Sequence, residues 1–208
     1  MMTKMFIVGM LSTNCYVTSC KETRDAIIID PGFDDQLAAE KIIKFIKENA
    51  LELKFIINTH GHPDHTCGNG IIKEKFHVSI LIHEDDAYML EELNKKAARF
   101  FGSNSFSPPA DILLHDGNLV KFGKITLKVM HTPGHTYGSI SLLGKKEVFT
   151  GDTLFAGSIG RTDLPGSSER DMRLSLEKLT SLPNHYIVYP GHGSTTTLGE
   201  EKLNNPFL

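Results

Sequence analysis

Residues 55–66 read FIINTHGHPDHT, an apolar run followed by a dense group of polar residues. Phe55 to Asn58 is a short apolar run of the kind that forms a buried strand. The run leads directly into a polar segment that holds three histidines within six residues, with an aspartate between them. A strand that ends in polar side chains places them at its carboxyl end, where open α/β sheets gather their ligand-binding groups. The stretch therefore predicts an α/β fold with a site at the end of this strand.

The cluster itself consists of His60, His62, Asp64 and His65. An isolated histidine is more often a hydrogen-bonded structural residue than a ligand, but four such residues in so short a segment reverse that expectation. Imidazole nitrogens and carboxylate oxygens suit zinc, iron and manganese. Alternating residues in a turn can also send neighbouring side chains toward two different ions. The cluster therefore predicts metal binding.

Three later motifs repeat the same arrangement of a β run followed by glycine and a possible ligand. They are HTPGH at 131–135, FTGD at 149–152 and YPGHG at 189–193, and they contribute His135, Asp152 and His192. Glycine at these positions allows the backbone to approach a ligand closely. Together with the cluster, the motifs supply seven ligands, which is enough for two ions that share a carboxylate.

The hydrophobic pattern predicts two sheet regions, each with its own helices. The predicted strands cover residues 4–8, 14–18, 26–29, 55–58, 79–82, several segments between 118 and 149, and 185–189. The predicted helices cover residues 35–48, a segment that begins near residue 84, and 169–179. Asp34 or Asp35 is placed to cap the first helix, and Ser168 with Asp171 fits a capping box for the last. This pattern favours a four-layer α/β/β/α sandwich in one domain that spans residues 1–208.

Composition narrows the partners and the compartment. The 208 residues carry a formal charge of -3 with scattered Lys and Arg, which argues against a nucleic-acid partner. The apolar runs are too short for a membrane span, and no secretory signal is evident. Cys15, Cys20 and Cys67 form no CxxC pair, which is typical of reduced thiols. We therefore expect a cytoplasmic protein with a small-molecule substrate; the sequence predicts no oligomeric state.

The motifs HGHPDH, TPGH, TGD and PGHG, in that order over residues 55–193, resemble the metallo-β-lactamase superfamily. Within it the chain looks most like the glyoxalase II branch, the hydroxyacylglutathione hydrolases, whose motif begins THxHxDH. We expect a short form without the C-terminal helical domain of full-length glyoxalase II enzymes. The resemblance implies the metallo-β-lactamase fold and two metal-ligand sets. It assigns His60, His62 and His135 to one metal, Asp64, His65 and His192 to the other, and Asp152 to the bridge between them.

The function that this resemblance implies is metal-dependent hydrolysis of a thioester or ester. Two divalent ions would be bound, with zinc expected first and iron or manganese as alternatives. A metal-bound bridging hydroxide would attack the carbonyl of a hydroxyacylglutathione-like thioester. Asp64 would orient that nucleophile, and Asp152 would hold both ions as the second catalytic carboxylate.

Other functions remain open on the same residues. The segment GRTD at 160–163 resembles persulfide dioxygenases, which share the fold but use one iron; that alternative assigns His60, His135 and Asp152 to the iron. Lactone or ester hydrolysis also suits two metals, since the surrounding loops choose the substrate. A non-catalytic metal-binding protein would be expected to lack a ligand, whereas all seven positions are filled here.

Substrate contacts are harder to assign from the sequence. Arg161 is a candidate for a substrate carboxylate, with an ion pair to Asp163 as the alternative. Tyr137 either faces the substrate or packs against the fold. Residues 94–110 read as an irregular connection that covers a pocket or lies on the surface. His131, four residues before His135, is a candidate for a bond that supports a metal ligand.

Overall fold

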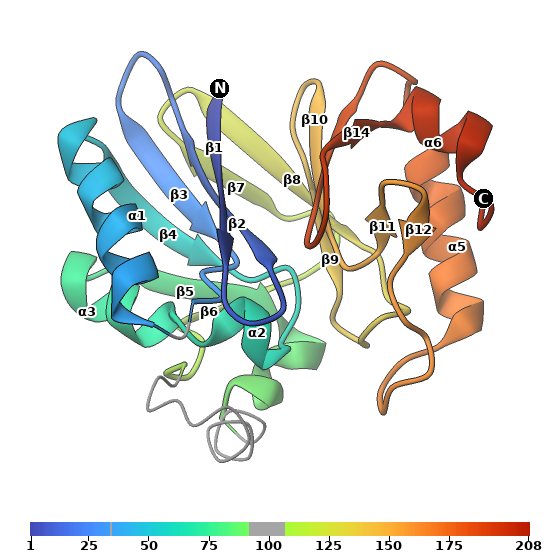
Figure 1. Ribbon diagram of the computed structural model, residues 1–208, viewed down its shortest axis with the longest axis horizontal. Helices are drawn as coiled ribbons and strands as arrows, with labels where there is room; N and C mark the ends of the chain where they lie inside the picture. The colour runs from blue at the N-terminus through green and yellow to red at the C-terminus, as the bar shows by residue number, and fades with distance from the viewer. Residues whose placement is uncertain (34, 92–106) are drawn as a thin grey trace.

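The protein is a four-layer sandwich, as the sequence predicted. The computed structural model describes residues 1–33, 35–91 and 107–208. Two six-stranded sheets face each other at the centre, with α1 and α3 outside the first sheet and α5 and α6 outside the second (Figure 1). A further two-stranded hairpin, β11–β12, lies beside the second sheet. Within the described ranges, no helix has both the length and the apolar character that a bilayer crossing requires.

The first sheet has the strand order β1-β2-β3-β4-β5-β6. Its strands are β1 (Met2–Val8), β2 (Thr13–Ser19), β3 (Asp25–Ile29), β4 (Glu52–Ile57), β5 (Ser79–His83) and β6 (Ile112–Leu114). β1, β2 and β3 pair antiparallel, whereas β3 to β6 run parallel. Parallel neighbours need crossover connections. These are α1 (Gln36–Glu48) between β3 and β4, and α2 (Pro63–Thr66) with α3 (Asn69–Phe76) between β4 and β5.

The second sheet has the order β14-β13-β10-β9-β8-β7. Its strands are β7 (Leu119–Phe122), β8 (Ile125–His131), β9 (Ile140–Leu143), β10 (Glu147–Gly151), β13 (Ile187–Pro190) and β14 (Thr196–Thr197). β10 and β13 are parallel, and the crossover between them contains β11 (Leu154–Phe155), β12 (Ser158–Ile159) and α5 (Glu169–Thr180). The chain closes with α6 (Leu198–Asn204), which lies near α5 (Figure 1).

Three hydrophobic clusters fill the three spaces between the four layers. Strand β3 contributes side chains to two of these clusters, because successive side chains of a strand point to opposite faces of the sheet. Ile28 packs with the helices α1 and α3, whereas Ile27 and Ile29 pack between the two sheets. The third cluster joins the second sheet to α5 and α6 through residues such as Met172 and Leu198. The continuous apolar run in β3 is therefore explained by burial on both faces.

The predicted helix caps are present. Asp35 caps α1 by accepting the Ala38 N–H at 2.8 Å, and Ser168 caps α5 by accepting the Asp171 N–H at 3.2 Å. Asp34, the alternative cap of α1, lies outside the described residues. Most of the proposed connection at 94–110 lies outside them as well, since the description resumes at residue 107.

The helix expected from residue 84 begins differently. Glu84–Asp86 form a 3-10 turn, η1, and α-helical structure begins at residue 87. His83 caps this turn, because its ring Nδ1 accepts the Asp85 N–H at 3.3 Å. Asp85 and Asp86 are neighbours in the sequence, but the turn points them into different environments. Asp85 is exposed, and Asp86 is fully buried.

Helix α1 offers a matched test of this packing. Ile42 is fully buried against the first sheet, whereas Leu37 on the same helix is 61% exposed. We predict that Ile42→Ala lowers the free energy of unfolding by about 2–4 kcal/mol, because it removes buried methylenes and leaves a cavity. Leu37→Ala should change it by less than about 0.5 kcal/mol. Urea unfolding of both variants measures the difference, and equal losses would contradict the assignment of the buried face.

Candidate metal centre

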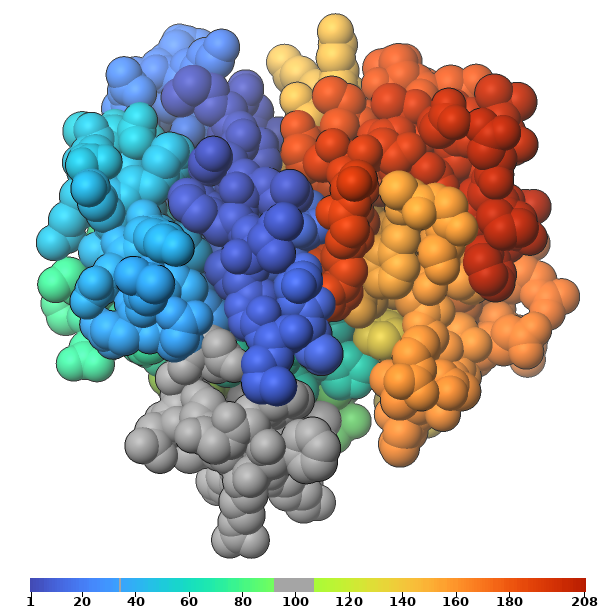
Figure 2. Space-filling model, viewed as in Figure 1, coloured from blue at the N-terminus to red at the C-terminus, as the bar shows by residue number. Residues whose placement is uncertain are grey.

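All seven predicted ligands converge at one edge of the sandwich. Each lies directly after a strand or on the helix that follows it: β4 and α2 supply the cluster, and β8, β10 and β13 supply one residue each. This edge is recessed in the space-filling view, between the blue tip of the β1–β2 hairpin and the orange segment that precedes α5 (Figure 2). Side chains that are far apart in the sequence therefore meet at this recessed edge.

The local geometry of THGHPDH separates its ligands into two directions. His62 is extended, with φ -66° and ψ 144°, and Pro63 begins α2 immediately after it. His60 lies in the bend just before His62, and the centroids of the His60 and His62 rings are 4.8 Å apart. Asp64 and His65 lie on the helical turn that follows. Proline suits the first helical position, because it has no N–H that would need a partner there. This placement explains how neighbouring residues join different ligand sets.

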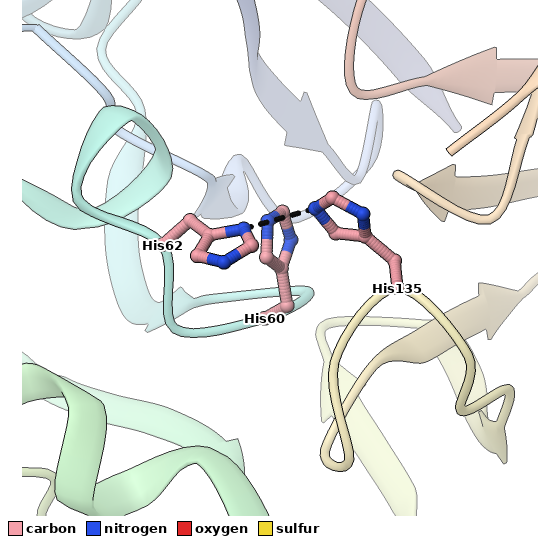
Figure 3. Close-up of side chains that lie close together, drawn as sticks. All are labelled: His60, His62 and His135. Atoms are coloured by element: carbon pink, nitrogen blue, oxygen red, sulfur yellow. Dashed lines mark hydrogen bonds between the residues drawn. The ribbon is translucent and has the colours of Figure 1, made fainter. Parts of the chain in front are cut away.

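The first set contains His60, His62 and His135, and Figure 3 shows their rings turned toward one another. One nitrogen from each ring lies within 4.8 Å of the others. His62 Nδ1 and His135 Nε2 are 2.9 Å apart. Two imidazole nitrogens at this distance form a hydrogen bond only when one of them carries a proton.

The second set contains Asp64, His65 and His192. Their candidate ligand atoms also lie within 4.8 Å of one another. Asp64 Oδ2 is 3.4 Å from the Nε2 atoms of both histidines, and those two nitrogens are 3.2 Å apart. Thr13 donates its hydroxyl to the same Asp64 oxygen at 3.1 Å, which fixes the carboxylate from the hairpin side.

Asp152 lies between the two sets. Its Oδ1 is 3.4 Å from His65 Nε2, and its Oδ2 is 3.5 Å from the Nε2 atoms of His135 and His192. The neighbouring loop approaches so closely that a Cβ on Gly191 would lie 2.1 Å from Asp152 Oδ1. Only glycine therefore fits in PGHG at this position. One carboxylate that faces histidines of both sets has the placement that a bridging ligand requires.

Four of the five histidines have their outward-facing ring nitrogen held by the protein. His135 Nδ1 donates to Arg161 O at 2.9 Å, His192 Nδ1 to Leu11 O at 3.1 Å, and His65 Nδ1 to Asp30 Oδ2 at 3.0 Å. The Nδ1 of His60 lies 3.2 Å from Thr59 Oγ1, whose own proton goes to Asp30. Such bonds fix the orientation of each ring and direct each Nε2 inward, as in metal-binding histidines.

Burial and mutual charge set the protonation of the cluster. Burial, followed by the proximity of His135, lowers the pKa of His62 to about 3. Burial also lowers the pKa of His60 well below its usual value. His65 differs: burial opposes its charge, but Asp64, Asp152 and Asp30 outweigh burial and raise its pKa to about 10. His60 and His62 are therefore neutral at pH 7, as metal ligands must be, whereas the carboxylates around His65 favour a positive charge on its ring.

The donor set fits divalent ions. His60 Nε2 and Asp152 Oδ1 are buried and make no hydrogen bond to any described residue. Buried polar atoms without partners are rare, because each loses its hydration without compensation. Here the two atoms face the other candidate ligands. A cation at this position would satisfy both atoms, so the residues present match the nitrogen and oxygen ligands of zinc, iron or manganese.

A buried carboxylate that the sequence did not reveal holds two ligand loops together. Asp86 accepts the Gly61 N–H at 2.8 Å and, through its other oxygen, the Gly138 N–H at 2.7 Å. It also accepts the hydroxyl of Thr136 at 2.7 Å. Gly61 lies between His60 and His62, and Thr136 follows His135, so Asp86 joins the two segments of the first set. Its only sequence signal is a carboxylate just after a strand.

Asp30 has the same role on the other side of the centre. It accepts the backbone N–H of Thr59 at 2.8 Å and the Thr59 hydroxyl at 2.7 Å, besides the ring of His65. In the sequence, Asp30 only marks the end of the strand before Pro31 and Gly32. Asn14 was missed as well: its amide donates to Pro190 O and Gly193 O at 2.9 and 2.8 Å, which fastens the β1–β2 hairpin to the loop of His192.

The predicted substrate contacts lie at the rim of the site. Arg161 forms a two-pronged ion pair with Asp163, with both N···O distances at 2.9 Å, and both side chains are about two-thirds exposed. Tyr137 is 54% exposed on the loop of His135. His131 donates Nε2–H to the Tyr137 carbonyl at 2.8 Å, so it supports this loop rather than a ligand ring directly. Cys67 is buried at the end of α2.

Comparison with known proteins agrees with this fold. Residues 8–192 match the metallo-beta-lactamase superfamily. Hydroxyacylglutathione hydrolase GloC of Haemophilus influenzae is 39% identical over 90% of this chain and 89% of its own length. An uncharacterized protein of Mycobacterium leprae is 38% identical over 98% of this chain and 96% of its own.

Two solved structures are also similar over nearly the whole chain. BLEG-1, a B3 metallo-beta-lactamase, has a TM-score of 0.90 at 36% identity and covers 100% of this chain and 99% of its own. TTHA1623 in a di-iron-bound form has a TM-score of 0.86 at 35% identity and covers 99% and 100%. The chain therefore belongs to the metallo-beta-lactamase superfamily, whose members bind divalent metals and are mostly metal-dependent hydrolases.

The position of Asp86 leads to a prediction about metal retention. Asp86→Asn replaces one carboxylate oxygen with a donor that faces N–H or O–H groups, so the two ligand loops lose part of their common anchor. We predict that metal affinity or turnover falls about 10–100-fold, the usual effect of removing a group that orients ligands. The exposed neighbour variant Asp85→Asn should leave turnover unchanged. Metal content after dialysis and steady-state kinetics measure both, and equal behaviour of the two variants would contradict the role of Asp86.

Proposed function

We propose that this chain hydrolyses thioesters of the hydroxyacylglutathione kind at a binuclear metal centre. The observation that carries the proposal is the pair of ligand sets that converge on one carboxylate, Asp152, at the recessed edge. The resemblance to hydroxyacylglutathione hydrolase GloC supports the choice of a thioester. Zinc is the first candidate metal, and the di-iron form of a similar structure supports iron as an alternative.

The proposed ligands are assigned to three groups. His60, His62 and His135 would hold one ion, Asp64, His65 and His192 the other, and Asp152 both. Two bound divalent ions would supply a nucleophilic water at neutral pH and polarise the substrate carbonyl. The protein's own contribution is to fix these groups, through the bonds to Asp30, Asp86, Leu11 and Arg161, before the substrate arrives.

Asp64 is the proposed orienting base. Burial opposes its charge, but His65 and His192 outweigh burial and hold its pKa below the usual range, so it is a carboxylate at neutral pH. With Thr13 donating to Oδ2, the carboxylate is positioned to accept a proton from the attacking water. Water then adds to the carbonyl carbon, the carbon–sulfur bond breaks, and the sulfur leaves as a thiolate that takes up a proton. The products are a carboxylic acid and a thiol.

The rim of the recess offers contacts for the rest of the substrate. Ile7, Met10 and Leu11 at the tip of the β1–β2 hairpin are 66%, 73% and 55% exposed, and Leu11 O is bonded to His192. Apolar side chains exposed next to a polar centre are typical of substrate-binding surfaces. Tyr137 and Arg161 face solvent at the same site and are proposed contacts for the thiol portion, with Arg161 suited to a carboxylate.

A second candidate function follows from GRTD, which resembles persulfide dioxygenases. That activity would use one iron and consume oxygen, so metal type and oxygen uptake separate it from hydrolysis. In the structure, the Arg161 and Asp163 of this motif pair with each other at the surface, and the Arg161 carbonyl supports His135. This arrangement serves either chemistry. The preference for hydrolysis therefore depends on the complete second ligand set.

The proposal predicts the behaviour of Asp64→Asn. The wild-type enzyme should hydrolyse S-lactoylglutathione, and the variant should lose at least about 100-fold in kcat with little change in KM, because it removes an acid–base group that acts in the transition state. Asp163→Asn, at the surface, should keep kcat.

A β-lactam and a lactone are tested as alternative substrates for hydrolysis. Oxygen uptake is measured separately with glutathione persulfide. Metal analysis of each variant shows whether a loss of rate follows from a loss of metal. Full turnover in an Asp64→Asn variant that retains its metals, or oxygen uptake without thioester hydrolysis, would contradict the proposal.

A further inference from the structure

A second convergence of possible metal ligands lies outside the seven-residue centre. It consists of His83 at the end of β5, Asp85 in η1 and His131 at the end of β8. One candidate ligand atom from each residue lies within 4.8 Å of the others. Among the described residues, no hydrogen bond joins His83, Asp85 or His131 to a ligand of the main centre. The cluster joins two strands from different sheets, so the fold itself brings it together.

The two imidazoles are prepared to act as ligands. His131 donates Nε2–H to the Tyr137 carbonyl at 2.8 Å, which leaves Nδ1 with its lone pair. A ring nitrogen that is bonded to a backbone carbonyl is the usual support of a metal-binding histidine. His83 Nδ1 accepts a weak bond of 3.3 Å from the Asp85 N–H and lies 3.6 Å from Asp85 Oδ2. Each ring therefore has a nitrogen near the carboxylate, and His83 Nδ1 must give up its weak bond to the Asp85 N–H when an ion binds.

The rings are also stacked on each other. His83 and His131 have their centroids 4.1 Å apart and an angle of 9° between the planes. Because an ion lies in the plane of each imidazole that binds it, one ring must turn out of this stack when both rings bind the same ion. The His83 side chain is 5% exposed, whereas that of Asp85 is 50% exposed. The cluster is therefore buried at His83 and open to solvent at Asp85. An ion can reach it from solvent without opening the fold.

Charged neighbours favour a cation on balance. Asp116 accepts the His131 N–H at 2.7 Å, and Glu84 accepts from His115 Nδ1 at 2.8 Å, with the rings of His115 and His83 6.3 Å apart. The positive group in contact is Lys178, which donates to the His131 carbonyl at 3.0 Å on the backbone side. The two imidazoles are therefore surrounded by three carboxylates and one ammonium group, which are those of Asp85, Asp116, Glu84 and Lys178.

We propose that His83, Asp85 and His131 form a third metal site, separate from the binuclear centre, for one borderline divalent ion such as Zn²⁺, Ni²⁺ or Cu²⁺. Two imidazole nitrogens with one carboxylate suit these ions better than Ca²⁺ or Mg²⁺, which prefer oxygen. Tetrahedral coordination needs donor atoms about 3.3 Å apart, so the exposed Asp85 must move inward. Three protein ligands leave a coordination position for water. This site does not rest on the proposed thioester hydrolysis.

Zinc binding to the zinc-loaded holoenzyme tests the site. Protein that has been loaded and dialysed is placed in equilibrium dialysis against rising free Zn²⁺, and the metal bound per chain is counted. We expect one further equivalent in the wild type. Asp85→Asn and His131→Asn should each weaken that equivalent at least about tenfold, because each removes a ligand. His115→Asn is the matched control: it changes a nearby histidine that is not a proposed ligand and should bind the extra zinc normally.

Two readouts keep the test independent of folding and of the main centre. The tightly retained metals and S-lactoylglutathione turnover should be unchanged in Asp85→Asn, and thermal unfolding shows whether His131→Asn is folded. No further zinc in the wild type, wild-type binding in both ligand variants, or equal loss in His115→Asn would each overturn the proposed site.

Discussion

The arrangement of the metal centre depends on one constraint: nitrogen and oxygen lone pairs of its ligands are buried where the edges of the two sheets meet. His60 Nε2 and Asp152 Oδ1 are enclosed without a hydrogen bond to any described residue, and His62 Nδ1 faces His135 Nε2 at 2.9 Å. Leaving His60 Nε2 and Asp152 Oδ1 without a hydrogen bond is costly in a fold that contains only protein atoms, because desolvated polar groups need partners. Divalent ions would satisfy these atoms together. The same constraint explains why the surrounding loops are tied so closely: ligands that point at one place must be held against their mutual repulsion.

Two buried carboxylates outside the centre supply most of that restraint. Asp30 connects the end of β3 to Thr59 and His65, and Asp86 connects η1 to Gly61, Thr136 and Gly138. Each acts across a gap between segments that would otherwise be independent loops. Each also depends on a complete set of donors, because a buried carboxylate with an unfilled oxygen would destabilise the fold. The site is therefore held by hydrogen bonds from backbone and side-chain donors to these two carboxylates, whereas the side chains of Tyr137 and Arg161 at the rim are exposed.

Much of this could be predicted from the sequence, and the reasons differ between residues. The seven candidate ligands were visible because each follows a β run and lies beside glycine or within a dense cluster. The two-faced burial of β3 and the caps of α1 and α5 also follow from local pattern. Asp30 and Asp86 were not predicted, since their partners lie 29 and up to 52 residues away and nothing local marks them. The short elements β6, β11, β12 and α6 were missed because their few residues carry too little periodicity to be recognised.

In the proposed centre, the seven side chains hold two metal ions. Metal content per chain, measured by mass spectrometry on freshly purified and dialysed protein without added metal, tests it most directly. We expect about two zinc, iron or manganese ions per chain, since both ligand sets are complete and Asp152 faces both. A single tightly held iron, with the set of Asp64, His65 and His192 empty, would contradict it.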